Sequence, residues 1–353
     1  MKATLLLENG MTFSGEAVGA PCERMFHLVC NNSMTGYQEV MTDPAYAGQG
    51  VVMTYPLIGN YGVCEGDGES RKPWISALVV RHLSPRGSNF RCTGTLDDYL
   101  KGHNIPGISG VDTRALTRIL RSQGTMRAML TFAESFSAQT LVKSLREYEE
   151  KSFLSEVTTR EVQRLEGPGK KVAVLDLGVT RSVLNALTAR GCEVTVYPAG
   201  TKAEAVLQKG HNGILISGGP GSPMGCGAVA DEVKQLYKSG VPVLGVGLGH
   251  QLIALAAGMR VEKLAYGHRG ASHPVRDEET GRVAVTTQNH GYAVTRDSIR
   301  PEVAAVSHVH VNDGTVEGLR YQKKPVITVQ FAPEQDPVSY GGRNIYDAFV
   351  ASL

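Results

Sequence analysis

The chain has 353 residues, of which 42% are hydrophobic and 20% charged, and its formal net charge is +2. This length suggests about two domains of ordinary size in a globular protein. The small net charge does not predict a nucleic-acid partner, and the apolar runs are too short to predict a membrane span.

The six cysteines are scattered along the chain, and none forms a CxxC pair. This spacing predicts neither a zinc cluster nor a disulfide framework, so we expect reduced thiols, no metal site and a cytoplasmic location. The first residues, 3–8, meet an acid and Asn-Gly after a few apolar positions. They predict a first strand rather than a signal peptide.

The first part of the chain predicts a mixed α/β domain. Short β-like runs are followed by two helical patterns, and the second helix has a plausible N-cap at Asp112. The predicted strands are 3–8, 51–54 and 77–80, and the predicted helices are 97–102 and 112–122. Charges, two glycines and a proline near 161–171 predict a surface linker, which we place at 151–170 between domains 1–150 and 171–353.

The second domain alternates regularly between apolar strands and helices. The predicted strands are 172–176, 193–197, 213–217 and 241–246, and the predicted helices are 181–190, 203–209 and 228–239. Nearly all-apolar strands that alternate with helices predict a parallel sheet with helices on both faces. Ligands of such sheets bind at the carboxyl ends of the strands.

Two glycine-rich segments follow predicted strands of this sheet. Residues 217–223, Ser-Gly-Gly-Pro-Gly-Ser-Pro, can turn backbone N–H groups into one concavity, although a plain loop is an equal alternative. Residues 245–251, Gly-Val-Gly-Leu-Gly-His-Gln, have the strand–turn–helix layout of a nucleophile elbow, with Gly247 at its centre. A phosphate site is disfavoured because the spacing fits neither GxGxxG followed by an acid nor GxxxxGK[ST].

Two further segments carry polar groups that can line a pocket. One is Gln-Asn-His-Gly-Tyr at 288–292, and the other is an apolar strand that ends in Ala-Pro-Glu at 332–334. Taken alone, His290 is more often a hydrogen-bonded structural histidine than a catalyst.

Together these segments resemble class I glutamine amidotransferases, and more closely the small subunits of carbamoyl phosphate synthetase. The first half contributes Asn-Ser-Met-Thr-Gly-Tyr-Gln-Glu at 32–39 and blocks at 42–46, 54–62 and 110–114. The second half contributes 218–223, 245–251, 267–270, 288–292 and 330–334. The resemblance runs essentially end to end, and the first-half blocks are distinctive of the small subunit.

The resemblance implies a fold and an activity. Residues 1–150 would form the small-subunit domain, and residues 171–353 the amidotransferase domain. Family members hydrolyse glutamine with a cysteine nucleophile and a histidine base. They pass the ammonia to a large subunit, which makes carbamoyl phosphate for arginine and pyrimidine synthesis. No cofactor is expected in this chain, because ATP and Mg²⁺ belong to the large subunit.

Mapped onto this chain, the resemblance leaves the catalytic triad incomplete. Gly247 stands at the nucleophile position and Ala332 at the base position, so that Glu334 alone is retained. The implied glutamine-binding positions fit better. They are Gly219, Gly221, Leu248, Gln251, Asn289, Gly291 and Tyr292, with Ala45 where some members have serine.

Further departures from the family are scattered through the chain. They fall at Phe26-His27, Thr180, Ser182, Ser222 and Gln335-Asp336. Such scatter favours natural divergence over a laboratory knockout of two residues.

Amide hydrolysis by this route needs a thiolate and a proton shuttle, which glycine and alanine do not provide. The leading hypothesis is therefore a small subunit whose glutaminase is lost or severely impaired, and which still binds a large subunit. One alternative is a regulatory pseudoenzyme that binds glutamine. Another is an active glutaminase with a rearranged site, for which Cys226 is the nearest thiol in sequence.

Overall fold

The computed structural model describes residues 1–149, 151–334 and 344–353, and the chain divides into two compact units, Met1–Lys151 and Ser152–Leu353. Residues 151–170, expected to be a linker, contain helix α5 (Leu154–Val157) and strand β12 (Gln163–Leu165). Because β12 pairs with β14 (Glu193–Pro198) of the second unit, most of this segment belongs to the second domain.

The first domain is built on a closed seven-stranded barrel in the order β1-β11-β3-β4-β7-β10-β2. Strand β1 closes one side of the barrel because it pairs antiparallel with both β2 and β11. The barrel strands are β1 (Lys2–Leu7), β2 (Thr12–Gly19), β3 (Arg24–Asn31), β4 (Gln49–Met53), β7 (Ala77–Val79), β10 (Pro106–Ser109) and β11 (Met126–Thr131). The sequence predicted a mixed α/β domain, and the closure into a barrel was not foreseen.

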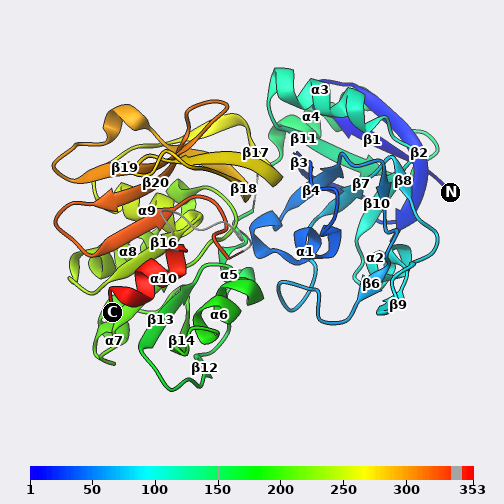
Figure 1. Ribbon diagram of the computed structural model, residues 1–353. Helices are drawn as coiled ribbons and strands as arrows, with labels where there is room; N and C mark the ends of the chain where they lie inside the picture. The colour runs from blue at the N-terminus through cyan, green and yellow to red at the C-terminus, as the bar shows by residue number, and fades with distance from the viewer. Residues whose placement is uncertain (150, 335–343) are drawn as a thin grey trace. The chain divides into compact units, whose positions relative to one another are not determined.

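Helices and short strands surround this barrel (Figure 1). The two predicted helices are confirmed as α2 and α3, and the Asp112 carboxylate accepts the backbone N–H of Ala115 as predicted for an N-cap. The helices are α1 (Tyr37–Thr42), η1 (Pro44–Tyr46), α2 (Leu96–Gly102), α3 (Thr113–Gln123) and α4 (Ala138–Glu147). The short strands are β5 (Leu57–Ile58), β6 (Val63–Cys64), β8 (His82–Leu83) and β9 (Cys92–Gly94).

The second domain contains a ten-stranded sheet in the order β12-β14-β13-β15-β16-β21-β20-β18-β17-β19. Strands β14, β13, β15, β16 and β21 are parallel, while β12 and β17–β20 pair antiparallel with their neighbours. The predicted parallel sheet is therefore wrong for half of the strands, and the sheet is mixed. The strands are β13 (Lys171–Asp176), β14 (Glu193–Pro198), β15 (Gly213–Ile216), β16 (Val243–Val246), β17 (Val261–Asp277), β18 (Val283–Val294), β19 (Ala304–His310), β20 (Val316–Tyr321) and β21 (Val326–Val329).

Helices cover both faces of the parallel part of this sheet, as predicted. One core combines α7, α8 and α9 with strand residues such as Ala173 and Leu175, and the other combines α6 and α10 with Val172 and Val174. Alternate strand residues thus enter opposite cores, because successive side chains point to opposite faces. The helices are α6 (Arg181–Thr188), α7 (Ala203–Leu207), η2 (Pro223–Gly225), α8 (Ala228–Lys238), α9 (Leu248–Ala256), η3 (Arg296–Ser298) and α10 (Ile345–Ala351).

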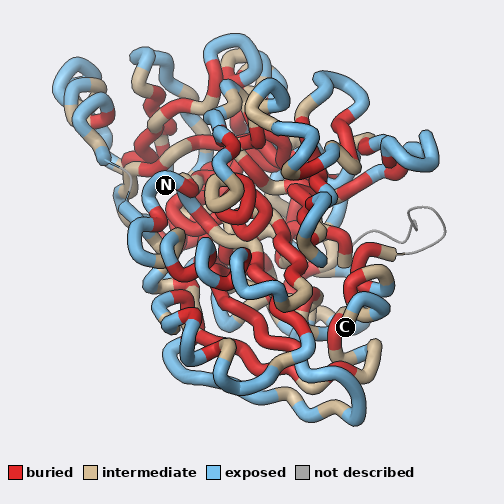
Figure 2. Tube along the Cα trace, turned by 90° about the vertical axis from the view of Figure 1, so that its left-hand side faces the viewer, coloured by how far each residue is buried: buried red, intermediate tan, exposed pale blue. Residues whose placement is uncertain are grey.

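The central strands of the second domain lie in its core, since every residue of β15 and β16 is buried. Figure 2 shows buried stretches of chain lying inward of exposed loops. Among the described residues, no helix is long and apolar enough to cross a membrane.

Candidate active site

The chain makes a sharp turn at Gly247 between β16 and α9, at the carboxyl end of the parallel strands. Gly247 has φ 56° and ψ −112°, a conformation that residues with a side chain rarely adopt. Its N–H donates to the carbonyl of Val329 at 2.9 Å, which joins the turn to the end of β21. The predicted strand–turn–helix layout is present.

The glycines on both sides of Gly247 are closely packed. A Cβ on Gly249 would lie 2.2 Å from the carbonyl oxygen of Ile216, and one on Gly245 would lie 2.5 Å from a methyl of Ile253. Position 247 differs, because a Cβ there would lie 3.4 Å from Gly218 Cα, an ordinary contact. The turn therefore has room for a side chain at its centre that this sequence does not supply.

The glycine loop after β15 lies against this turn. A Cβ on Gly219 would lie 2.1 Å from the carbonyl oxygen of Leu177, so this position also accepts only glycine. Ser217 fixes the start of the loop, since its hydroxyl accepts the N–H of Leu177 at 2.9 Å and its carbonyl accepts the N–H of Gly249 at 3.1 Å. Gly221 is exposed and has φ 86°. The loop thus approaches both β13 and the elbow through its backbone.

Two candidate triad positions follow β21. Ala332 is half-buried, and its N–H donates to the carbonyl of Thr287 at 3.0 Å. Its methyl group cannot transfer a proton. Glu334 instead accepts a hydrogen bond from the hydroxyl of Tyr346 at 3.3 Å. Gln335 and Asp336, named above as departures, lie outside the described residues.

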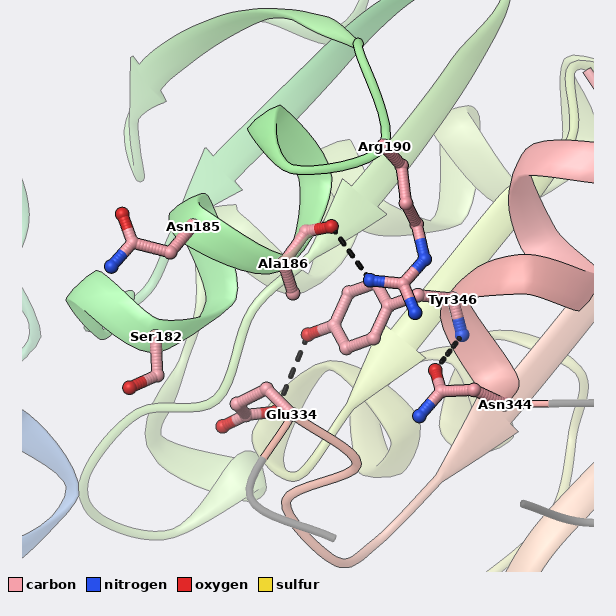
Figure 3. Close-up of a pocket in the computed structure, with 7 residues that line it drawn as sticks. All are labelled: Ser182, Asn185, Ala186, Arg190, Glu334, Asn344 and Tyr346. Carbon is pink, nitrogen blue, oxygen red and sulfur yellow. Dashed lines mark hydrogen bonds between the residues drawn. The ribbon is translucent and has the colours of Figure 1, made fainter. Parts of the chain in front are cut away.

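Glu334 lies in a small cavity of about 330 Å³ (Figure 3). Arg190 packs over the ring of Tyr346, with its guanidinium carbon 5.4 Å from the ring centroid, and donates to the carbonyl of Ala186 at 2.8 Å. The lining residues are Ser182, Asn185, Ala186, Arg190, Glu334, Asn344 and Tyr346. The retained carboxylate therefore shares its cavity with polar side chains of α6 and with α10.

Several of the predicted glutamine-binding residues are connected around the elbow. The side-chain amide of Gln251 donates to the carbonyl of Tyr292 at 3.1 Å and to Gln330 Oε1 at 3.0 Å. Leu248 is buried, and Gly291 is half-buried. Asn289 is distinctive because its Nδ2 is buried and has no hydrogen-bond partner among the described residues.

Ala45 belongs to the first domain. It lies in η1 after Asp43, whose carboxylate accepts the N–H of Ala45 at 2.9 Å. The structure describes this residue only within its own domain, so its assignment to the glutamine site stays a prediction.

The alternative nucleophile, Cys226, is poorly suited to attack. Burial raises the pKa of its thiol to about 11, and its Sγ donates to the carbonyl of Ser222 at 3.6 Å. The other cysteine of this domain, Cys192, is buried in the core, and burial also raises its pKa. Since the thiolate is the nucleophilic form, neither thiol is activated.

The histidine next to the elbow is no better placed as a base. Burial lowers the pKa of His250 to about 3, and its Nδ1 lies 2.7 Å from the hydroxyl of Thr328. His290 donates from Nδ1 to the carbonyl of Tyr292 at 2.9 Å, in agreement with a structural role for its imidazole.

Two further residues shape the site, and no local sequence signal marks either of them. Gln330 was noted only within a motif, yet its amide oxygen holds Gln251. Tyr346, the partner of Glu334, lies on α10, and nothing in the local sequence connects the two.

Comparison with known proteins agrees with this architecture. Residues 5–130 match the family described as carbamoyl-phosphate synthase small chain, CPSase domain, and residues 173–352 match class I glutamine amidotransferases. The fold and these two matches thus define a two-domain protein with an amidotransferase fold. The chain belongs to the carbamoyl phosphate synthase small-chain family.

Similar curated proteins match along nearly their whole length. The chain is 47% identical over 352 residues to the carbamoyl phosphate synthase small chain of Symbiobacterium thermophilum, covering 98% of this chain and 97% of that one. It is 43% identical over 350 residues to the small chain of Clostridium perfringens, with 99% of both covered. It is also 43% identical over 355 residues to the pyrimidine-specific small chain of Bacillus subtilis, covering 100% and 96%.

Proposed function

We propose that this protein is a small subunit of a carbamoyl phosphate synthase whose own glutaminase is lost or severely impaired. It binds a large subunit, which carries ATP and Mg²⁺, and supports or regulates synthesis from free ammonia for the arginine and pyrimidine pathways. Family membership supports the partner. The elbow supports the loss, because position 247 has space for a side chain and carries none.

The size of the loss follows from the chemistry. Without a thiol at 247 no acyl-enzyme forms, and without an imidazole at 332 no proton moves between nucleophile and leaving group. Removing the nucleophile or the base of a comparable hydrolase lowers the rate roughly a millionfold. The raised pKa of Cys226 argues against a substitute nucleophile.

Two measurements test this proposal. Ammonia release from glutamine should be at background, compared with an active family member assayed in parallel. A pull-down with the large subunit should give a complex, and the complex should change the rate of ammonia-dependent carbamoyl phosphate formation. Robust glutamine turnover refutes the loss of activity, and failure of both complex formation and rate change refutes the partnership.

A second candidate function is glutamine binding without hydrolysis. The unpaired, buried Nδ2 of Asn289 favours it, because such a group gains a hydrogen bond when a ligand carbonyl or carboxylate arrives. Calorimetry with L-glutamine decides between the two. Binding without turnover supports a regulatory pseudoenzyme, and no binding supports a purely structural subunit.

A further inference from the structure

A cluster of polar side chains is buried within the antiparallel part of the second domain, on strands β17, β18 and β20 (Figure 1). His268 on β17 pairs in register with His290 on β18, and Glu317 lies on β20. All three are buried, and Glu317 is fully inaccessible. Within the described part of the chain, the ion-pair partners of Glu317 are these two imidazoles.

Two ring nitrogens and one carboxylate oxygen of these residues form a small triangle. His268 Nδ1 lies 3.2 Å from His290 Nε2 and 3.2 Å from Glu317 Oε1, and the last two atoms lie 3.6 Å apart. Ligand atoms held about 2.0–2.1 Å from a tetrahedral zinc ion lie roughly 3.3–3.4 Å from one another. The triangle therefore has the dimensions of one face of a zinc tetrahedron.

The outer atoms of both imidazoles fix which nitrogen faces the triangle. His268 Nε2 lies 2.7 Å from a carboxylate oxygen of Asp313, and His290 Nδ1 lies 2.9 Å from the carbonyl of Tyr292. Both partners are acceptors, so each of these nitrogens carries a proton and donates it. The inner nitrogens, His268 Nδ1 and His290 Nε2, therefore face the triangle.

Glu317 and Gln288 add two more acceptor oxygens. The amide nitrogen of Gln288 donates to Glu317 Oε2 at 3.1 Å, which leaves Gln288 Oε1 3.0 Å from His290 Nε2. Two imidazole nitrogens, a carboxylate oxygen and an amide oxygen thus converge on one small space. Burial lowers the pKa of His268, but its hydrogen bonds to Asp313 and Glu317 raise it to about 9. Without a metal ion, a proton on His268 Nδ1 therefore lies among these atoms, and a bound metal ion would take its place.

We propose that His268 Nδ1, His290 Nε2 and Glu317 Oε1 bind a zinc ion, with Gln288 Oε1 next to the fourth position. The outer contacts match those of zinc sites. A ligating histidine almost always donates its other N–H to a carboxylate or a backbone carbonyl, and ligating carboxylates are themselves hydrogen-bonded. Asp313, Tyr292 and Gln288 fill these three roles.

A neighbouring group of histidines fits less well. His273 Nδ1 lies 3.1 Å from His310 Nε2, and both rings lie near that of His268. However, His268 Nε2 donates to Asp313, and the other ring nitrogen of His268, Nδ1, faces Glu317 and His290. His268 therefore offers no third ligand atom to His273 and His310. For this reason His273 provides a matched control for the proposed site.

The proposal is independent of glutamine hydrolysis, and its test reads metal binding directly. The full-length protein is stripped with a chelator and titrated with ZnCl₂ by calorimetry. We expect one ion per chain with a Kd of about 1 μM or tighter. Glu317→Gln should weaken binding at least tenfold, while His273→Asn leaves it unchanged.

Cobalt gives a second readout that requires no substitution, in case Glu317→Gln does not fold. Co²⁺ added to the stripped wild-type protein should give the intense visible absorption of a four-coordinate site, and Zn²⁺ should displace it. The proposal is overturned if zinc does not bind stoichiometrically, or if cobalt gives only a six-coordinate spectrum. It is also overturned if His273→Asn abolishes binding that Glu317→Gln retains, which would assign the ion to the neighbouring histidines.

Discussion

The backbone at the elbow gives a quantitative prediction for Gly247→Ala. This residue has φ 56° and ψ −112°, and an added Cβ meets Gly218 Cα only at 3.4 Å, so the penalty is backbone strain without a collision. Such strain costs of order 1–3 kcal/mol for a residue with a side chain. For a domain the size of Ser152–Leu353, this corresponds to a fall in Tm of roughly 2–12 °C.

Calorimetry of the unfolding transition measures this fall, and Gly249→Ala provides the control. A Cβ at 249 would lie 2.2 Å from a backbone oxygen of β15, so its introduction must move the sheet or the helix and should destabilise more. A Gly247→Ala protein as stable as the wild type would refute the strain argument. A loss equal to that of Gly249→Ala would refute the claim that position 247 has room for a side chain.

Three further outcomes follow from the same site and its surroundings. Gly247→Cys alone should give no glutaminase activity, whereas Gly247→Cys combined with Ala332→His should release measurable ammonia from glutamine. Robust turnover by the single variant would show that Ala332 does not occupy the base position. Cys226 should react with iodoacetamide much more slowly than a free thiol near pH 8, because burial raises its pKa to about 11. Hydrogen bonds from the Ala203 N–H and from Lys202 lower the pKa of Glu232. The wild-type protein should therefore be more stable than Glu232→Gln above the ordinary glutamate pKa, and this difference in the free energy of unfolding should fade as the pH falls below it. Denaturant unfolding at several pH values measures the difference.

The sequence predicted the parallel half of the second domain well because its signals are local. Apolar runs of strand length, helices ended by glycine, and Gly245 and Gly249 around the turn are all visible within a few residues. The structure then supplies the reason for those glycines, since each lies against a neighbouring strand or helix.

The barrel and the antiparallel strands could not be predicted in the same way. Closure depends on β1 pairing with β11, more than a hundred residues later, and no local pattern encodes that register. The same reason hides the histidine cluster from the sequence. Cysteine spacing carries no signal of it, because His268, His290 and Glu317 meet only where three strands pair in one sheet.

The presence of the predicted glutamine-binding residues is only weak support for glutamine binding, because several of them also have structural roles. Gly219 is fixed by the carbonyl of Leu177, and Gln251 is occupied by Tyr292 and Gln330. These residues have structural reasons to stay after catalysis is lost.

Asn289 has no such reason, because its buried Nδ2 bonds to nothing among the described residues. Leaving a buried donor unsatisfied costs about 1–3 kcal/mol, so Asn289→Ala should not destabilise the protein and can stabilise it. If the pocket binds glutamine, the same substitution should abolish the calorimetric signal while the Tm is kept. A protein that binds glutamine equally well with alanine at this position would remove Asn289 from the site, and a large loss of stability would give it a structural role instead.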